Sequence, residues 1–511
     1  MDNSNVVTNI NLPTDKNNKW YVVGLGELLI DCFPNGKHKL GGAPAIFAYH
    51  AKESSDGAFN SLIVSAIGKD GKIIADKNEV IVNIDKDEND NNIERKKLNY
   101  FLYKNDRKTG EVNVDATNPN DPKYTINTDV AWTEIPYSDE LEKIAQHTLA
   151  VYFGSLASYC GKISEKTIDC FLSNTPSNCL KIFDVNLRNN PNEPLYSESL
   201  LIKLINSCNV LKVNLEELGE ILPIVLKQKG YDAERAIASM GDIKKCKVLM
   251  HNLNNIRLLI VTMGEDGSSI FWREKTNDEK STTKNTTDDE EYEIAFSSLG
   301  MPAKVKNTVG AGDALAGAFI GEILRKGQPY TKQSSLLDWL LHNNKEERNS
   351  IYFRKVIFAA HHFAVNRATL VCEEDDSMPK EILQKELFVC YAHQDEDIVN
   401  LFGKKFKENN ISFWLDCQDL NTGSIFPAEI ERAIRNCNAF IYFSSKYSNE
   451  SDYIKNNEIP WAIKYDKNIL PIKLDKADLH EDLMKTHHFF DCDFDFTFSK
   501  LMDDIKQKIT E

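Results

Sequence analysis

The chain has 511 residues, 41% of them hydrophobic, and a formal net charge of −16 at pH 7. This length exceeds that of one ordinary domain, and the hydrophobic content suffices for buried cores, which excludes wholesale disorder. The acidic balance argues against general nucleic-acid binding, which needs a basic face, but permits local sites for anionic nucleotides.

The amino-terminal residues 1–19 form a polar tail without the apolar core of a signal peptide, and no apolar run has membrane-spanning length. The 11 cysteines are scattered and never spaced as Cys-x-x-Cys, which indicates neither a disulfide framework nor a zinc ribbon. We therefore expect a cytoplasmic protein, with neither nucleic acid nor membrane among its partners.

The first predicted elements follow the tail. Residues 21–30 form an apolar run that predicts a buried strand, and a small-residue helix is expected over 41–51 after a Gly-Gly turn. From about 81 to 130, short alternating stretches separated by Asn, Asp and Pro predict a small β-rich appendage outside the main sheet.

Strand and helix patterns then alternate. Four apolar stretches predict strands, at residues 149–153, 180–185, 210–213 and 258–262, with helical segments between most of them. This alternation is typical of a parallel sheet in an α/β layer. The strongly polar stretches 85–97 and 274–291 are interpreted as solvated insertions.

The segment Asn307–Asp313 has two glycines two positions apart, then a carboxylate, then an apolar helical run. Glycines allow close approach of the backbone to a ligand, and the first N–H groups of a helix attract anions. Asp313 beside such an anion could take a proton from an attacking hydroxyl, which suggests phosphoryl transfer. An ordinary loop-to-helix turn is the alternative.

A polar stretch at 373–386 predicts a linker, after which the alternation restarts on a smaller scale. Strands are expected at 387–391, 411–415, 439–443 and 469–474, with helices at about 395–409, 427–436 and 453–465. Four strands in so short a segment predict a compact, flavodoxin-like doubly wound domain.

Residues 20–372 resemble the PfkB (ribokinase-like) family of sugar and nucleoside kinases, and within it the fructokinases. The motifs that carry the resemblance occur in order along the chain: Gly26–Asp31, Gly41–Ala45, Thr109-Gly110, Val130–Trp132, Phe183–Arg188, Lys212–Glu217, Thr262–Gly267 and the segment at 307–313. The resemblance implies a central, mostly parallel sheet with a small β lid, formed by about 31–40 and 81–130.

It also implies a function for each matching residue. Asp313 would be the catalytic base, ATP the phosphoryl donor, and Glu217 with Asn214 would hold Mg²⁺, through water in the case of Glu217. The substrate would be bound by Asp31, Gly41, Gly42, Asp184, Asn186 and Arg188. The nucleotide and its phosphates would be bound by Lys212, Asn214, Glu217, Thr262, Gly264, Gly267, Thr308, Gly310, Ala311 and Gly312.

Two positions depart from the family pattern. Ile46 stands where family members commonly carry an Asn that contacts the sugar, and Asn307 stands where they commonly carry Asp. Neither change removes the base. A working kinase and a ligand-sensing domain without turnover therefore both remain open.

The carboxyl-terminal region, 387–511, resembles the TIR family over roughly 386–475. The resemblance rests on Phe388–Asp395, Phe413–Asp416, Ser444–Tyr447 and the segment from Ser451 to Pro460. It implies that Glu458 is the catalytic carboxylate of an NAD⁺-cleaving site, with Tyr391, Trp414 and Ser445 in the NAD⁺ pocket. Packing in the core and an exposed acid are the alternatives for these residues.

The two resemblances together predict a sensor–effector protein. The first domain would bind a sugar, nucleoside or nucleotide, and the TIR domain would hydrolyse NAD⁺ as a homo-oligomer, in bacterial antiphage or stress defence. Two alternatives stay open: a working sugar kinase regulated by its TIR domain, and a TIR domain that only binds other proteins.

Overall fold

The computed structural model describes two compact units, 1–262 with 303–379, and 263–302 with 380–511. Within them it describes the residues 5–13, 20–55, 57–84, 94–115, 123–190, 193–230, 237, 239–275, 292–300, 304–326, 340, 347–374, 387–408, 411, 413–415, 430, 434, 437, 439–465, 467–475, 483 and 490–491. In these ranges no helix is both long and apolar enough to cross a membrane.

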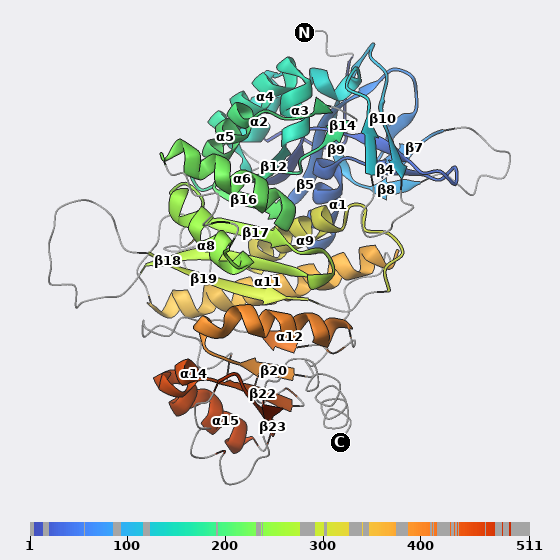
Figure 1. Ribbon diagram of the computed structural model, residues 1–511. Helices are drawn as coiled ribbons and strands as arrows, with labels where there is room; N and C mark the ends of the chain where they lie inside the picture. The colour runs from blue at the N-terminus through green and yellow to red at the C-terminus, as the bar shows by residue number, and fades with distance from the viewer. Residues whose placement is uncertain are drawn as a thin grey trace, which may run out of the picture. The chain divides into compact units, whose positions relative to one another are not determined.

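The first unit is built on a mostly parallel sheet (Figure 1). Its strand order is β1-β9-β5-β2-β12-β13-β16-β17, and only β1 is antiparallel to its neighbour. The bounds are β1 Val6–Thr8, β2 Tyr21–Leu25, β5 Asn60–Gly68, β9 Asn99–Asn105, β12 Thr148–Gly154, β13 Leu180–Asp184, β16 Val210–Asn214 and β17 Leu258–Thr262. Every residue of β2 and of β12 is buried, as expected of strands covered on both faces.

The described helices of this unit fall into three groups by their main contacts. Helix α9 (Ala311–Lys326) packs on both α1 (Ala43–Ser55) and α11 (Glu347–Cys372). A second group contains α2 Asp139–Gln146, α3 Ser155–Cys160, α4 Lys162–Asn174 and α5 Glu198–Ser207, and a third contains α6 Leu215–Gln228 and α8 Asp242–Asn252. The α1–α9 contact is close because of Gly317, where an added Cβ would lie 2.4 Å from the carbonyl oxygen of Phe47.

A second sheet, which we call the lid sheet, has the order β11-β10-β3-β4. Its strands are β3 Leu29–Cys32, β4 His38–Gly41, β10 Gly110–Asp115 and β11 Lys123–Ile126. A separate three-stranded sheet contains β6 Ile73–Asp76, β7 Glu79–Val82 and β8 Arg95–Lys97. These strands account for most of the β-rich region expected from the sequence.

Three predictions about elements were wrong. The single strand over 21–30 is two strands in different sheets, because the backbone turns at Gly26, where φ is +147°. Residues 99–105 join the main sheet as β9, with Tyr100–Tyr103 all buried, rather than the appendage. Residues 95–97 pair with β7 rather than forming part of a solvated insertion.

The second unit contains a parallel sheet in the order β21-β20-β22-β23-β24, with the antiparallel hairpin β18–β19 next to β21. The strands are β18 Ser268–Lys275, β19 Tyr292–Leu299, β20 Leu387–Cys390, β21 Phe413–Leu415, β22 Ala439–Ser444, β23 Asn468–Lys473 and β24 Phe490–Asp491. From β20 onward the chain follows the order 2-1-3-4-5, which is the flavodoxin-like order predicted.

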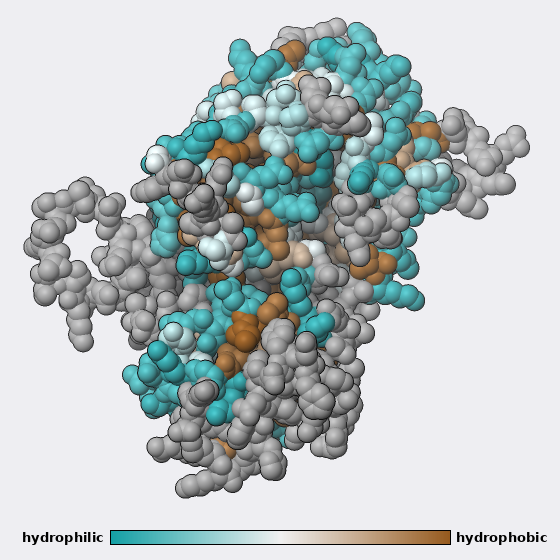
Figure 2. All heavy atoms as spheres, viewed as in Figure 1, coloured by the Kyte–Doolittle hydropathy of each residue, from teal (hydrophilic) through white to brown (hydrophobic). Residues whose placement is uncertain are grey.

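The helices of the second unit include α12 Glu396–Glu408, α14 Lys446–Glu450, the π-helical turn η5 Ile454–Glu458 and α15 Ile459–Lys464. Most of the predicted helix at 427–436 and most of the stretch 274–291 lie outside the described residues. On the face in Figure 2, hydrophobic residues form small patches among hydrophilic ones. Among the described residues of this unit, the exposed large hydrophobic side chains Leu401, Tyr447 and Ile463 lie on three different helices.

Candidate functional site

The predicted site residues of the first unit gather where the central parallel strands end. Gly154 of β12 is in register with Asp184 of β13, and Asp184 with Lys212 of β16. Asn214 at the end of β16 is in register with Thr262 at the end of β17. Strand order reverses between β2 and β12, and the carboxyl edge at such a point is where open α/β sheets bind ligands.

Four polar groups form the centre of this site, of which three are buried and Asp313 is partly buried. Lys212 Nζ lies 2.8 Å from Asp184 Oδ2 and 3.7 Å from Asp313 Oδ1. The hydroxyl of Tyr152 lies between the two carboxylates, 2.9 Å from Asp313 Oδ1 and hydrogen-bonded to Asp184 Oδ2. Tyr152 was not predicted, because its strand reads as purely apolar; it comes from β12, and its ring stacks on Phe47.

The environment of Asp313 suits a general base. Burial raises the pKa of Asp313 to about 6, against 3.8 ordinarily, and Asp184 raises it further, while Lys212 and the Tyr152 hydroxyl lower it. A carboxylate with this pKa is ionised at neutral pH and is a stronger base than an exposed aspartate. It is therefore poised to accept a proton near pH 7.

Residues Gly310–Asp313, which we call the cradle, open helix α9. Gly310 has φ +78°, and the amide of Ala314 donates to the carbonyl of Gly310 at 2.9 Å. The amides of Gly312 and Asp313 precede this first α-helical hydrogen bond, so they are placed to meet an anion. An added Cβ on Gly312 would lie 3.3 Å from Lys212 Nζ, so this ammonium lies against the cradle backbone.

The two departures from the family pattern lie next to the cradle. Asn307 accepts the amide of Val309 at 3.0 Å, so its side chain shapes the turn without carrying a charge. An added Cβ on Gly310 would lie 3.4 Å from Ile46 Cγ2. Ile46 therefore places an apolar wall where family members commonly have an amide.

Glu217 is a structural capping residue as well as a candidate magnesium residue. Its Oε2 accepts the amide of Asn214, its Oε1 accepts the amide of Leu187, and Asn214 Oδ1 accepts the amide of Glu217. Burial, with Asp184 next, raises the pKa of Glu217 to about 7. With both oxygens engaged, Glu217 fits Mg²⁺ through water rather than directly.

A magnesium ion in this fold also needs acceptors near the phosphates. The described residues contain no cluster of three or more His, Cys, Asp or Glu of the kind that holds a metal. Asp184 Oδ1 is buried without a hydrogen-bond partner. This oxygen fits a hydrated ion bound chiefly by the phosphates, or a substrate hydroxyl.

The predicted substrate residues lie next to the lid sheet. An added Cβ on Gly41 would lie 2.4 Å from Asp31 Oδ2, so only glycine leaves room for this carboxylate. Gly42 has φ +100°, which also favours glycine. Burial first, then Glu94, raises the pKa of Asp31 to about 7.

Glu27 is a further site residue that sequence reasoning did not assign. It is 2% exposed, its Oε2 has no hydrogen-bond partner, and an added Cβ on Gly154 would lie 4.0 Å from its Oε1. Burial raises the pKa of Glu27 to about 8, with Asp313 also raising it and Arg188 lowering it. Glu27 could have been predicted from its position just after β2, in the sequence Gly-Leu-Gly-Glu.

Arg188 and Asn186 follow β13. The guanidinium of Arg188 stacks over the ring of Tyr124, 4.6 Å from its centroid, which joins the site to strand β11 of the lid sheet. Asn186 has φ +38°, a left-handed conformation that Asn tolerates better than most residues. Asn186 therefore shapes the turn that carries Arg188.

Gly264 and Gly267 lie in the second unit, in and after a short 3₁₀ turn. Both have positive φ, +57° and +87°, and the amide of Met263 donates to the carbonyl of Gly267 at 2.8 Å. Their part in nucleotide binding stays a prediction. The same holds for Thr308, whose carbonyl accepts the amide of Ala311.

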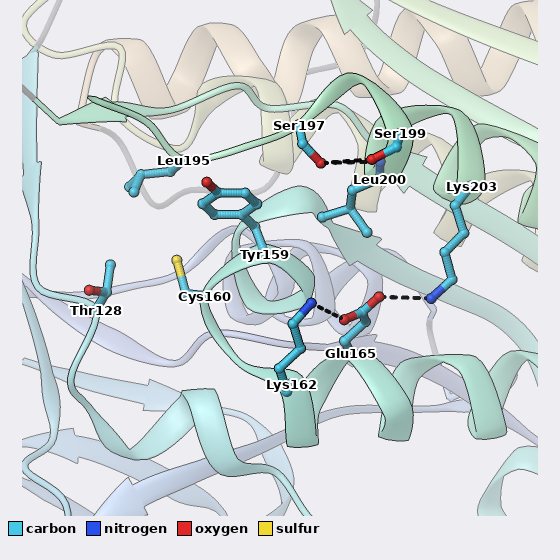
Figure 3. Close-up of a pocket in the computed structure, with 10 residues that line it drawn as sticks. All are labelled: Thr128, Tyr159, Cys160, Lys162, Glu165, Leu195, Ser197, Ser199, Leu200 and Lys203. Atoms are coloured by element: carbon cyan, nitrogen blue, oxygen red, sulfur yellow. Dashed lines mark hydrogen bonds and ion pairs between the residues drawn. The ribbon is translucent and has the colours of Figure 1, made fainter. Parts of the chain in front are cut away.

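A pocket of about 660 Å³ lies elsewhere in the first unit, between α3, α4 and α5 (Figure 3). None of the predicted site residues lines it. Its two lysines are already paired: Lys162 Nζ lies 3.0 Å from Glu165, and Lys203 Nζ lies 2.9 Å from Glu165 and 2.7 Å from Asp169. We therefore do not assign it to the predicted chemistry.

In the second unit, Glu458 lies against the end of strand β20. Glu458 is 8% exposed, and the thiol of Cys390 donates a hydrogen bond to it. Burial raises the pKa of Glu458 to about 7 and raises that of the Cys390 thiol well above its ordinary value. Tyr391, which follows Cys390, is buried at the same end of β20.

Ser445 follows β22, the neighbour of β20 across the point where strand order reverses. Its hydroxyl oxygen caps α14 by accepting the amides of Tyr447 and Ser448, both at 3.1 Å, and its hydrogen is donated to Asp395 at 2.5 Å. A role in binding NAD⁺ stays a prediction for Ser445 and Tyr391. Trp414 lies in β21, and its side chain lies outside what the structure describes.

Comparisons with known proteins match a family model to each of two parts of the chain. Residues 34–333 match the pfkB family carbohydrate kinase model, and residues 387–502 match the TIR domain model. No curated protein matches the chain.

Several solved sugar kinases are similar to the chain at low sequence identity. The fructokinase from Xylella fastidiosa with bound ATP is 15% identical, with 69% of this chain and 92% of that chain covered and a TM-score of 0.44. The ribokinase from Giardia lamblia is 15% identical, with 69% and 93% covered and a TM-score of 0.44. The ribokinase from Arabidopsis thaliana complexed with ribose and ATP is 14% identical, with 71% and 94% covered and a TM-score of 0.41.

Proposed function

Because the chain belongs to the pfkB family of carbohydrate kinases, we propose that its first unit binds ATP and the hydroxyl of a sugar or nucleoside. We further propose that occupancy of this site controls NAD⁺ cleavage by the TIR domain. The pairing of Asp313 with the buried Lys212 at the cradle is the observation that carries the proposal. It combines a base, a cation and anion-binding amides within one site.

The residues of the first unit support a single in-line transfer. The carboxylate of Asp313 takes the proton of the acceptor hydroxyl while that oxygen attacks the γ-phosphorus, and the bond to the β-phosphate oxygen breaks to release ADP. The cradle amides and the Lys212 ammonium stabilise the charge on the phosphoryl oxygens. Mg²⁺, when bound, would neutralise phosphate charge, with Asp184 and, through water, Glu217 to hold it.

Residues on the lid side of the site would orient the substrate. The carboxyl groups of Asp31 and Glu27 offer hydrogen-bonding partners for sugar hydroxyls, and Arg188 offers a cation. The apolar wall at Ile46 removes one polar contact to the substrate, which costs on the order of 1–3 kcal/mol of binding where family members have an amide. A domain that senses the ligand by binding it, and turns it over slowly, tolerates the loss of this polar contact better than a fast metabolic kinase does.

For the second unit we propose NAD⁺ hydrolysis at the nicotinamide–ribose bond, with Glu458 as the catalytic carboxylate. Breaking this bond builds positive charge on the ribose, and an ionised carboxylate in a buried site stabilises that charge. The burial of Glu458 at the end of β20 supports the proposal. A part in bacterial antiphage or stress defence, in the cytoplasm and through TIR-mediated homo-oligomers, extends it by analogy.

Nicotinamide release by the full-length protein tests the effector half. We expect release at high protein concentration and its loss in Glu458→Ala, while Glu450→Ala, a nearby exposed acid on α14, keeps the wild-type rate. Equal low rates in the wild type and Glu458→Ala would contradict the proposal.

The second candidate is a working sugar kinase whose TIR domain regulates it or binds other proteins. The intact base and cation at the cradle favour this candidate over a domain without turnover. ATP consumption with a panel of hexoses, pentoses and nucleosides tests it. Fast turnover with one acceptor, together with no nicotinamide release under any condition, would favour this candidate over the sensor–effector.

A further inference from the structure

The end of helix α11 is hydrogen-bonded to the segment that leads into the cradle. The carbonyl of Cys372 accepts the amides of Lys306 at 2.8 Å and Asn307 at 3.2 Å. Glu373 Oε1 accepts the amide of Lys304 at 2.9 Å. Since Asn307 Oδ1 in turn accepts the amide of Val309, a continuous set of hydrogen bonds joins α11 to Val309, the residue before the cradle.

The next residue, Glu374, reaches the lid sheet. Its Oε1 lies 2.8 Å from Lys39 Nζ and 3.5 Å from Lys37 Nζ. Lys39 is in β4, where it stands in register with Asp31 of β3, the predicted sugar-binding carboxylate. The hydrogen bond from Lys39 also lowers the pKa of Glu374, so this contact is a charged pair at neutral pH.

The backbone at Glu374 is unusual. Its φ is +53°, in the left-handed region where helices commonly end on glycine, and its amide donates to the carbonyl of Val371 at 3.0 Å. Glycine would adopt this conformation more easily than glutamate. Helix termination alone therefore does not call for glutamate here, whereas the contact with Lys39 does.

We propose that Cys372–Glu374 is a coupling element that transmits ligand occupancy of the kinase-type site to the TIR domain, which begins at Leu387. The proposal deepens the sensor–effector function and rests on it. A sugar on Asp31 acts on β4, and a phosphate on the cradle acts on residues 304–310. A shift of β4 and a shift of residues 304–310 would therefore both be felt at Cys372–Glu374. These residues end α11, the last described helix before β20.

An exposed ion pair by itself adds little to global stability, so the test must measure local opening of the connected residues rather than global unfolding. We choose amide hydrogen exchange in the ligand-free, full-length protein carrying Lys37→Gln and Lys39→Gln. We expect exchange at Lys306, Asn307 and Glu374 to rise several-fold, although the substituted side chains touch none of these amides.

The matched control is Lys72→Gln, which removes the ion pair to Glu111 on β10 of the same lid sheet. It should leave exchange at 304–309 and 372–374 unchanged. The exchanged pair Lys39→Glu with Glu374→Lys should restore protection to near the wild-type level.

Unchanged exchange at 304–309 and 372–374 in the double variant would overturn the proposal, as would an equal rise in the Lys72→Gln control. The readout needs neither NAD⁺ nor a known sugar. Increased exchange in the double variant, together with no nicotinamide release by the wild type, would support the coupling element and reject the effector activity. Failure of the coupling proposal can thus be told apart from failure of the proposed function.

Discussion

At the scale of single residues, burial sets the acid–base chemistry of both sites. Desolvation is the largest cause of the raised pKa values of Asp313, Glu27 and Glu458, which are about 6, 8 and 7. Asp313 keeps its pKa the lowest of the three because Lys212 and the Tyr152 hydroxyl stabilise its charge. Each site thus holds a carboxylate that titrates close to neutral pH.

The first prediction concerns the base. Asp313 must be ionised to accept a proton, so kcat/KM for phosphoryl transfer should fall tenfold per pH unit below about 6 and level off above it. Asp313→Asn should lower kcat by about 10²–10⁴-fold with little change in ATP binding. Asp242→Asn, the same change at an exposed helix start, is the control. A variant at Asp313 with full activity would remove it as the base.

The second prediction separates function from stability at Glu458. Its folded pKa of about 7 exceeds the ordinary 4.5, so its protonated form contributes stability that is present below about 4.5 and lost as pH rises through 7. A difference of this size corresponds to about 3 kcal/mol. Glu458→Gln should therefore abolish NAD⁺ cleavage yet make the protein more stable than the wild type at pH 8, but not at pH 4.5. Urea unfolding at the two pH values measures this, and equal effects at both would contradict it.

At the scale of elements, small residues and turns decide how the first unit is assembled. Gly26 redirects the chain from the main sheet into the lid sheet, and Gly317 lets α9 approach α1 at backbone distance. The approach matters for the site because α9 carries the cradle and α1 carries Ile46 and Phe47. The contact between α1 and α9 therefore also sets the distance between the cradle and Ile46.

The third prediction compares two helical glycines. Gly317→Ala should destabilise the protein by about 1–3 kcal/mol, because its Cβ would lie 2.4 Å from the carbonyl oxygen of Phe47. Gly219→Ala on α6 has nothing within 4 Å and should stabilise by up to about 1 kcal/mol through helix propensity. Calorimetric unfolding temperatures of the two variants should move in opposite directions. A rise of the unfolding temperature in both variants would show that α1 and α9 can separate at little cost.

At the scale of the whole molecule, a kinase-type site and a TIR domain share one chain. The question is whether the TIR domain responds to ligand binding at this site or to phosphoryl transfer there. The contacts of Cys372–Glu374 depend on the positions of β4 and the segment 304–307. They involve no group that changes chemically during phosphoryl transfer. Binding alone should therefore be sufficient.

The fourth prediction follows from this. Asp313→Asn should keep any effect of ATP, Mg²⁺ and D-fructose or D-ribose on nicotinamide release, because asparagine preserves the shape of the cradle. Gly310→Val should lose it, since valine is strained at φ +78° and its Cβ would press on Ile46. Loss of the effect in both variants would show that turnover, not binding, is sensed.

The sequence by itself determined the local features: buried strands, the polar residues at their ends, the glycine turns of the cradle, and the two family patterns. These features depend on periodicity and on residue type over a few neighbouring positions, and both can be read directly from a sequence. Only the tertiary structure placed Tyr152 between Asp184 and Asp313, moved β9 into the main sheet, and brought Glu374 to Lys39. It also decided that the carboxylates titrate near neutrality, because burial and long-range pairing arise only when segments distant in the chain are packed together.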